Sequence, residues 1–382
     1  MKEIKSIYIH IPFCKEKCVY CDFYSEKINE NFRFIDEYLY ALKLELLHYK
    51  EYLSPLVDTI YIGGGTPSLL STTQIRYLLE FIKAQIEFER SYEFTFEMNP
   101  ESVDINKLKL IYDFGVNRVS LGIQSLNNTV LKRLNRIHNK TTAIKSIDKI
   151  IGSNFTNVGV DFLLGVVKGS TTIIKDIEAI LSQFDIKHIS TYIITLNKER
   201  KREIHPSIAN IGEDEVVREY VDIHRFLSER GFLHYEISNY AKKQFESRHN
   251  INYWENGYYI GLGASAAGHY INYRGKIIRY KNVSNIQEYI KSIRSGKPSF
   301  EEYEEIDSLT DANEYIMLSL RTAHGLSIKK IKNLIGKERI ELLMNRALKL
   351  QRDGLIKISK GSIAPTLKGF ILNNIISREL MF

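Results

Sequence analysis

The stretch His10-Ile-Pro-Phe-Cys14-Lys-Glu-Lys-Cys18-Val-Tyr-Cys21 contains all three cysteines of this 382-residue chain. The cysteines follow the run Ile7–Ile11, which has the composition of a β-strand. Three thiols on one short loop can converge on a single metal centre. A closed zinc site needs four ligands, so zinc would require His10 as the fourth. A [4Fe–4S] cluster held by three cysteines leaves one iron open to a non-protein ligand, and the spacing favours this arrangement.

The composition is that of a globular protein, with 44% hydrophobic and 26% charged residues. The length predicts roughly two or three domains. Three cysteines are too few for a disulfide framework, which indicates a reducing compartment. Because the sequence has no apolar run of about eighteen residues and no export signal, we expect a cytoplasmic protein without a transmembrane segment.

The first half of the chain alternates short β-rich runs with segments of helical spacing. Tyr38, Leu42 and Leu46 mark one helix, and Ser71 with Gln74 forms a capping box before another. Alternating strands and helices predict parallel β/α units. Six units favour an α/β fold that is a partial (β/α)6 barrel, with a doubly wound sheet as the alternative. The six expected strands are Ile7–Ile11, Thr59–Ile62, Tyr92–Glu97, Arg118–Gln124, Asn157–Leu163 and His188–Thr195.

Polar residues and glycines occur where these strands end, the position at which a barrel places its ligand. The turn Gly63-Gly64-Gly65-Thr66-Pro67 follows the second strand, and its bare backbone can approach a ligand. Glu97 and Gln124 end the next two strands, and Arg136 is expected in the following helix. Asp161 lies within an apolar strand, where it needs a partner. A structural salt bridge to Arg136 and a ligand contact are the two interpretations.

The C-x3-C-x2-C loop after the first strand resembles that of the radical S-adenosylmethionine (SAM) superfamily, and the stretch from Tyr8 to about Thr195 resembles its anaerobic coproporphyrinogen III oxidase branch. The resemblance implies that Cys14, Cys18 and Cys21 hold the cluster and that SAM binds the open iron. It also implies reductive SAM cleavage to a 5′-deoxyadenosyl radical, with an electron donor such as flavodoxin or ferredoxin. The SAM contacts that it implies are Tyr8, Tyr20, Gly64, Gly65, Thr66, Glu97, Gln124, Arg136, Asp161 and Thr195.

Two functions are open within that branch. The oxidase has a further cysteine two residues beyond the third ligand, where this chain has Phe23, and a longer N-terminal extension. The segment Arg248-His-Asn-Ile-Asn-Tyr-Trp254 instead resembles the H-N-x-x-Y-W signature of the HemW haem chaperones. That resemblance implies haem as cargo, respiratory haem proteins as recipients, and a haem site at His249, Asn250, Tyr253 and Trp254. The alternative is that His249 caps a turn while Tyr253 and Trp254 pack in the core. Oxidative decarboxylation of coproporphyrinogen III is the alternative function.

The C-terminal part differs from the rest in charge and pattern. Residues 321–382 hold thirteen basic and four acidic side chains. Helical patterns precede the pair Leu355–Ile358 and Ser362–Pro365, which predicts a winged-helix-like domain. We expect no specific nucleic-acid partner, and the basic charge leaves peripheral contact with a membrane open. The predicted domains are a radical SAM barrel at 1–200, an extension carrying the haem segment at 201–309, and the winged-helix-like domain at 310–382. The glycines within 261–266 lack the spacing of a dinucleotide site.

Overall fold

The computed structural model describes residues 4–28, 34–166, 171–194 and 211–382. Its core is a sheet of nine strands in which six parallel strands follow one another in chain order. This order confirms the partial barrel and excludes a doubly wound sheet, whose strand order would reverse. The six strands are β1 (Ser6–Ile11), β4 (Leu56–Gly64), β5 (Glu87–Met98), β6 (Arg118–Gln124), β7 (Asn157–Leu164) and β8 (His188–Ile193).

Three further strands, which were not predicted, extend the sheet at its two edges. β11 (Ile260–Leu262) pairs in parallel with β1, and β10 (Asn239–Ala241) joins β8 antiparallel, followed by β9 (Leu233–Glu236). Beside the cysteine loop, β2 (Phe13–Cys14) pairs with β3 (Glu26–Lys27).

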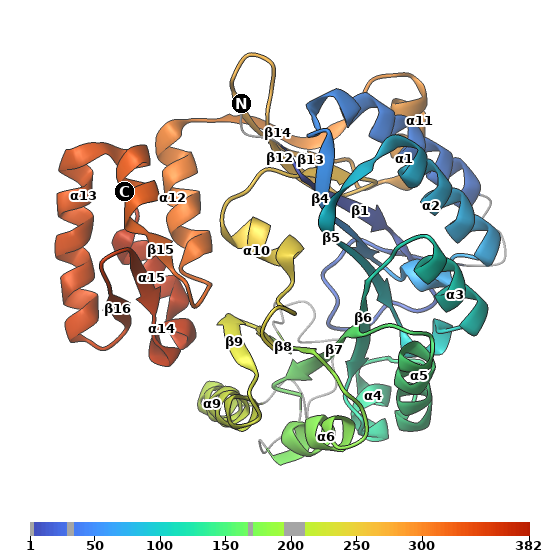
Figure 1. Ribbon diagram of the computed structural model, residues 1–382, viewed down its shortest axis with the longest axis horizontal. Coiled ribbons are helices and arrows are strands. Elements are labelled where there is room, and N and C mark those ends of the chain that lie inside the picture. The colour runs from blue at the N-terminus through green and yellow to red at the C-terminus, as the bar shows by residue number, and fades with distance from the viewer. Residues whose placement is uncertain (1–3, 29–33, 167–170, 195–210) are drawn as a thin grey trace.

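Helices cover the outside of the sheet (Figure 1). Their apolar stripes face inward: Ile75, Leu78 and Leu79 are fully buried. The predicted capping box is confirmed, because Gln74 N–H donates to Ser71 Oγ and Ser71 N–H donates to Gln74 Oε1. The helices are α1 (Ile35–Tyr49), α2 (Thr72–Gln85), α3 (Ile105–Asp113), α4 (Asn128–Arg133), α5 (Lys140–Gly152), α6 (Thr171–Leu181) and α9 (Glu213–Glu229).

A small antiparallel sheet packs beside β11, and one helix packs against α1. The sheet consists of β12 (Ala267–Ile271), β13 (Ile277–Asn282) and β14 (Phe300–Ile306), and the helix is α11 (Ile286–Arg294). Close packing explains the glycines that precede this sheet. A Cβ on Gly261 would lie 1.7 Å from the carbonyl oxygen of Ala267.

The C-terminal segment has an apolar cluster of its own, to which Ile316, Leu343 and Ile363 belong. Its predicted helices and hairpin are present, together with a third strand and two terminal helices that were not expected. Gly336, with a φ of 79°, interrupts α13. The elements are α12 (Ser308–Ser319), β15 (Leu326–Ser327), α13 (Ile328–Arg352), β16 (Ile356–Ile358), β17 (Ser362–Pro365), α14 (Leu367–Ile371) and α15 (Asn373–Leu380).

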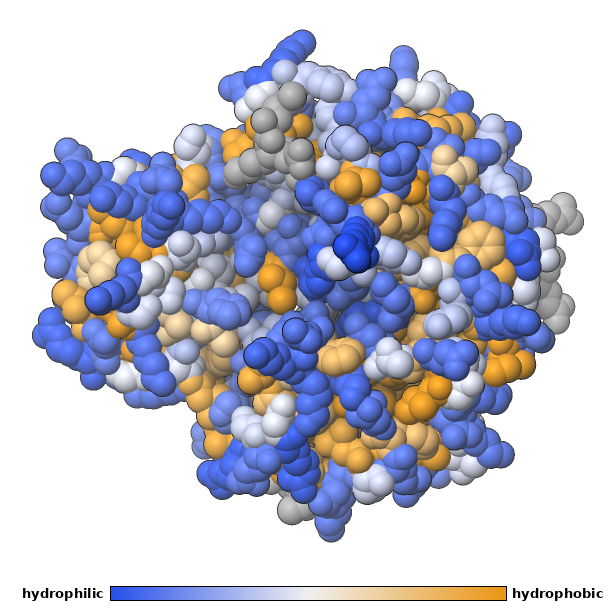
Figure 2. Space-filling view, in the orientation of Figure 1, coloured by the Kyte–Doolittle hydropathy of each residue, from blue (hydrophilic) through white to orange (hydrophobic). Residues whose placement is uncertain are grey.

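The short helix α10 (Arg248–Trp254) lies at the amino-terminal ends of β4 and β5. The buried Glu93 carboxylate accepts hydrogen bonds from the backbone N–H groups of Arg248 and His249. The cysteine loop follows the carboxyl end of β1, at the opposite end of the barrel. In Figure 1, α10 lies between the barrel and α12, and Figure 2 shows mostly hydrophilic side chains on this face.

Two local expectations concern the position of Arg136 and the end of β8. Arg136 lies in the turn between α4, which ends at Arg133, and α5, so its predicted placement in a helix was wrong. The strand predicted to reach Thr195 is described to Ile193, and Thr195 lies outside the described residues. The predicted domain boundaries after residues 200 and 309 stay a prediction. No helix in the described part of the chain is long and apolar enough to span a bilayer.

Candidate cofactor site

A cavity of about 430 Å³ opens at the carboxyl ends of the parallel strands. It brings together most of the residues that the sequence singled out for the cluster and SAM. Tyr8 does not line it; the Tyr8 hydroxyl instead lies 2.9 Å from His10 Nδ1. Thr195 lies outside the described residues. The predicted residues that line the cavity are Cys14, Cys18, Cys21, Tyr20, Gly64, Gly65, Thr66, Glu97, Gln124, Arg136 and Asp161.

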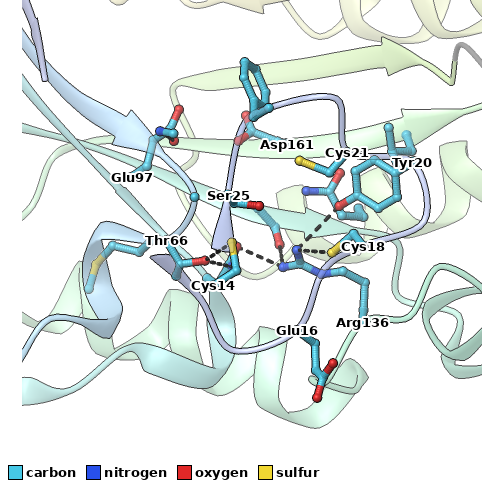
Figure 3. Close-up of a pocket in the computed structure, with 18 of the residues that line it drawn as sticks. Cys14, Glu16, Cys18, Tyr20, Cys21, Ser25, Thr66, Glu97, Arg136 and Asp161 are labelled. Carbon is cyan, nitrogen blue, oxygen red and sulfur yellow. Dashed lines mark hydrogen bonds between the residues drawn. The ribbon is translucent and has the colours of Figure 1, made fainter. Parts of the chain in front are cut away.

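The three cysteines border this one cavity (Figure 3). Cys14 Sγ lies 3.6 Å from Thr66 Oγ1, and the Arg136 guanidinium lies 3.5 Å from Cys18 Sγ. Burial raises the pKa of the Cys14 thiol, and the hydrogen bond from Thr66 opposes that rise. Across the described residues, no group of three or more His, Cys, Asp or Glu side chains is already arranged as a metal site.

His10 cannot serve as a fourth zinc ligand in this geometry. Its Nε2–H donates to the carbonyl oxygen of Tyr24 at 2.9 Å, so Nδ1 is left to accept the Tyr8 hydroxyl at 2.9 Å. Burial lowers the pKa of His10 to about 4, so the ring is neutral and has one lone pair, which Tyr8 uses. The donor set at the cavity is therefore three thiols, which fits a [4Fe–4S] cluster with an open iron.

Arg136 ties the cysteine loop to the ends of the strands. Its Nη1 lies 3.5 Å from the Tyr20 hydroxyl, and its Nη2 donates to the carbonyl oxygen of Gly122 at 2.8 Å and to Asn99 Oδ1 at 3.0 Å. The Asn99 side-chain amide in turn donates to Thr66 Oγ1 at 2.9 Å. Asp161 does not pair with Arg136; its carboxylate accepts from Ser120 instead. The salt bridge considered from the sequence is therefore absent here.

Two half-buried carboxylates, Glu97 and Asp161, face the cavity. Glu97 Oε1 accepts the Tyr61 hydroxyl at 2.5 Å, and Oε2 accepts the Gly64 N–H at 3.1 Å. Burial raises the pKa of Glu97 to about 7 and also raises that of Asp161. Among the described residues, neither carboxylate forms a salt bridge with Lys, Arg or His. The cavity can therefore accept a cationic ligand, whose charge would favour the ionised form of both groups.

The glycine turn lets the chain pass close to the cysteine loop. A Cβ on Gly65 would lie 2.7 Å from the carbonyl oxygen of Phe13, and a Cβ on Gly63 would lie 2.8 Å from the Glu97 carboxyl group. Gly64 has a φ of 109°, which L side chains rarely adopt. SAM carries an ammonium and a sulfonium charge, and these residues fit it: carboxylates, a bare backbone turn and three adjacent thiols.

Some residues that line the cavity were not predicted from the sequence. Asn99 directly follows β5, so the same rule that selected Glu97 could have found it. Tyr61, Ser120 and Tyr192 point inward from within their strands. Alternation along a strand indicates which side chains share a face, but it does not show that these reach the ligand space.

The segment predicted to bind haem lies at the other end of the barrel. His249 is fully buried, with Nδ1 at 2.8 Å from Thr59 Oγ1 and Nε2 at 2.7 Å from the Tyr253 hydroxyl. Because Thr59 donates its own proton to Ser6, Nδ1–H of His249 donates to Thr59 and Nε2 accepts from Tyr253. Iron ligation by His249 stays a prediction, and it would require the bond to Tyr253 to break.

Comparison with known proteins defines the class of this protein. Residues 8–182 match the radical SAM superfamily, and residues 306–372 match the HemN C-terminal domain. The fold and the three-cysteine cavity are thus those of a radical SAM protein. Within that class the chain belongs to the HemW family.

Curated relatives named "Heme chaperone HemW" support this assignment. The protein of Lactococcus lactis subsp. lactis is 32% identical over 386 residues, covering 100% of this chain and 98% of its own. That of Bacillus subtilis is 32% identical and covers 97% of both chains. The solved structure of coproporphyrinogen III oxidase (HemN) from Escherichia coli matches with a TM-score of 0.84 at 19% identity, over 100% of this chain and 90% of that one. This likeness shows the fold.

Proposed function

We propose that the protein is a cytoplasmic haem chaperone that binds haem and passes it to respiratory proteins that need it. The observation that carries this proposal is similarity along the whole chain to proteins named "Heme chaperone HemW". A shared radical SAM segment alone would leave the activity open, because one fold hosts many functions.

In this proposal Cys14, Cys18 and Cys21 hold a [4Fe–4S] cluster, and SAM occupies the adjacent cavity. When bound, the cluster supplies a low-potential electron, received from a donor such as flavodoxin or ferredoxin. The Glu97 carboxylate pairs with the ammonium of SAM, and the backbone of Gly64 and Gly65 admits its methionyl part. We assign Tyr8, Tyr20, Thr66, Gln124, Arg136, Asp161 and Thr195 as further SAM contacts or supports of that site.

The test of haem binding uses anaerobically reconstituted protein. Titration with haem should give a saturable Soret band with one haem per chain, and apo-cytochrome added afterwards should take up that haem. A chain that shows no saturable binding, or that never releases haem to an acceptor, would remove the chaperone function. The full-length protein without haem serves as the spectral reference.

The second candidate is a SAM-dependent coproporphyrinogen III oxidase, favoured by the fold that the chain shares with HemN. Phe23 stands where the oxidase has a further cysteine, and its side chain is 65% exposed at the cavity. We therefore expect no protoporphyrinogen IX from coproporphyrinogen III, SAM and reductant. Formation of protoporphyrinogen IX over many turnovers would support the oxidase function in place of the chaperone function.

A further inference from the structure

A second cleft, of about 840 Å³, lies at the amino-terminal end of the barrel, between α10 and the C-terminal segment. Its volume is within the range of about 300–1,000 Å³ that is usual for small-molecule sites. Hydrogen bonds hold its two walls together: Asn256 Nδ2 donates to Asp311 Oδ1 at 2.8 Å, and Ala323 N–H donates to the carbonyl oxygen of Tyr235 at 2.9 Å. The cleft is thus a defined part of the fold, and the residues assigned to SAM do not line it.

One wall offers an aromatic surface with an unused donor. Trp254, the last residue of α10, and Tyr315 both line the cleft. The Arg321 guanidinium lies 5.7 Å from the centre of the Trp254 ring. The indole N–H of Trp254 is buried and has no hydrogen-bond acceptor among the described residues. A buried donor without an acceptor costs free energy, which a ligand with an oxygen acceptor would recover.

His324 supplies an accessible imidazole at the same cleft. Of the histidines that the structure describes, only His324 and His48 are exposed, and His48 lies in α1 on the other side of β1 and β4. The turn that carries His324 is fixed. Gly325 has a φ of 70° and packs so closely on β17 that a Cβ would lie 2.1 Å from the carbonyl oxygen of Ile363.

The cleft also contains cations that suit a dicarboxylate. Arg248 and Lys330 line it, together with the acidic side chains of Glu246 and Glu255. Arg248 already pairs with Asp58, and Lys330 donates to the carbonyl oxygen of Glu255 at 2.6 Å. These cations are therefore held in place at the cleft. Haem combines a flat apolar ring, an iron that takes a neutral imidazole, and two propionate carboxylates.

We propose that the cargo haem binds in this amino-end cleft, with its iron ligated by His324 and its ring against Trp254. The inference rests on the proposed chaperone function and names the site for it. It gives the α10 segment a role without breaking the bonds of His249: Arg248 and Trp254 contact the haem, and His249 holds the helix in place. It also separates the haem from SAM, because the two sites lie at opposite ends of the barrel.

The first experiment compares haem binding by His324→Gly with that of the wild type and of His48→Gly, the matched exposed histidine. His324→Gly should bind haem at least about tenfold more weakly, since losing even an outer partner costs that much at a metal site. It should also lose the histidine-ligand signature in the EPR spectrum. Added imidazole should restore both, which a merely structural role of His324 would not allow. His48→Gly should behave as the wild type.

The second experiment titrates haem into cluster-loaded protein with and without saturating SAM. The two ligands should bind together, with the haem affinity unchanged. Competition by SAM would place haem in the carboxyl-end cavity and overturn the proposal. An unaltered EPR signature in His324→Gly would overturn the ligand assignment while leaving the chaperone function standing. If the wild type itself binds no haem, both the function and the site are wrong.

Discussion

The carboxyl-end cavity and the amino-end cleft lie at opposite ends of one barrel and are built differently. The cavity collects residues at or just beyond the carboxyl ends of consecutive strands, such as Cys14, Thr66 and Glu97. The cleft joins α10 to the turn around His324, two segments that become neighbours only because the C-terminal segment docks against β9. The first kind of site depends on the topology of a sheet, whereas the second depends on how two parts of the molecule pack.

A short column of side chains connects the two regions. The Tyr61 hydroxyl donates to Glu97 in the cavity, and its ring centre lies 5.3 Å from that of His249 in α10. The column continues from His249 Nε2 to the hydroxyl of Tyr253, with which it forms a hydrogen bond. A change at one end of this column thus has a physical route to the other, and variants at each end test whether the two sites act separately.

The largest effect is expected when all three cysteines are replaced by alanine. Iron and sulfide should fall to background after anaerobic reconstitution, because the cluster loses every protein ligand. SAM binding should be lost with them, while haem binding at the amino-end cleft should persist. Iron and sulfide analysis measures the loss of the cluster, and a haem titration measures haem binding. Phe23→Ala, at the same cavity but without a thiol, is the matched control and should keep its iron. A parallel loss of haem binding in the cysteine variant would show that the sites are not separate.

Glu97→Gln should weaken SAM binding by about tenfold to a hundredfold, the worth of a hydrogen bond to a charged group. The wild type should also respond to pH. Its pKa of about 7 means that Glu97 is mostly ionised at pH 8 and mostly protonated at pH 6. A cationic ligand binds the ionised form, so affinity should fall about tenfold over that range. Calorimetry with cluster-loaded protein measures both effects.

The control for this pH dependence is Glu45→Gln. Burial raises the pKa of Glu45 to about 7 as well, but its carboxylate bonds Tyr289, Gly263 and Asn282 away from the cavity. The Glu45→Gln protein should keep the pH response of SAM binding, and the Glu97→Gln protein should lose it. The opposite pattern would remove Glu97 from the SAM site.

Much of the cavity could be predicted from the sequence because its residues obey a local rule. A polar residue or glycine at the end of a strand lies at one rim of the sheet, whatever the details of packing. That rule placed Gly64, Glu97 and Gln124 correctly beside the cysteine loop. It could not settle the partner of Asp161, because the choice between Arg136 and Ser120 depends on where a turn directs the guanidinium group.

The cleft could not be predicted in that way. The sequence marked the α10 segment as functional, but it gave no sign that His249 would be buried with both ring nitrogens bonded. Nor did it connect Trp254 with His324, since no periodicity relates an interior helix to a turn in a separate apolar cluster. Such contacts arise when the C-terminal segment packs against the barrel, and they become visible only in the burial and hydrogen bonds of the folded structure.

The smallest effect is expected from Glu93→Gln, which tests whether the position of α10 matters to haem alone. The two carboxylate oxygens of Glu93 accept the N–H groups of Arg248 and His249. A glutamine would turn its NH2 group toward one of these donors, so we expect a loss of about 1–3 kcal/mol in the free energy of unfolding. Urea denaturation measures this loss, and hydrogen exchange should speed up in residues 248–254. Glu89→Gln, on the same strand but paired with Lys5, is the matched control. Haem affinity should fall in Glu93→Gln while SAM affinity stays constant; an equal loss of both would mean that the column through Tyr61 couples the two ends of the barrel.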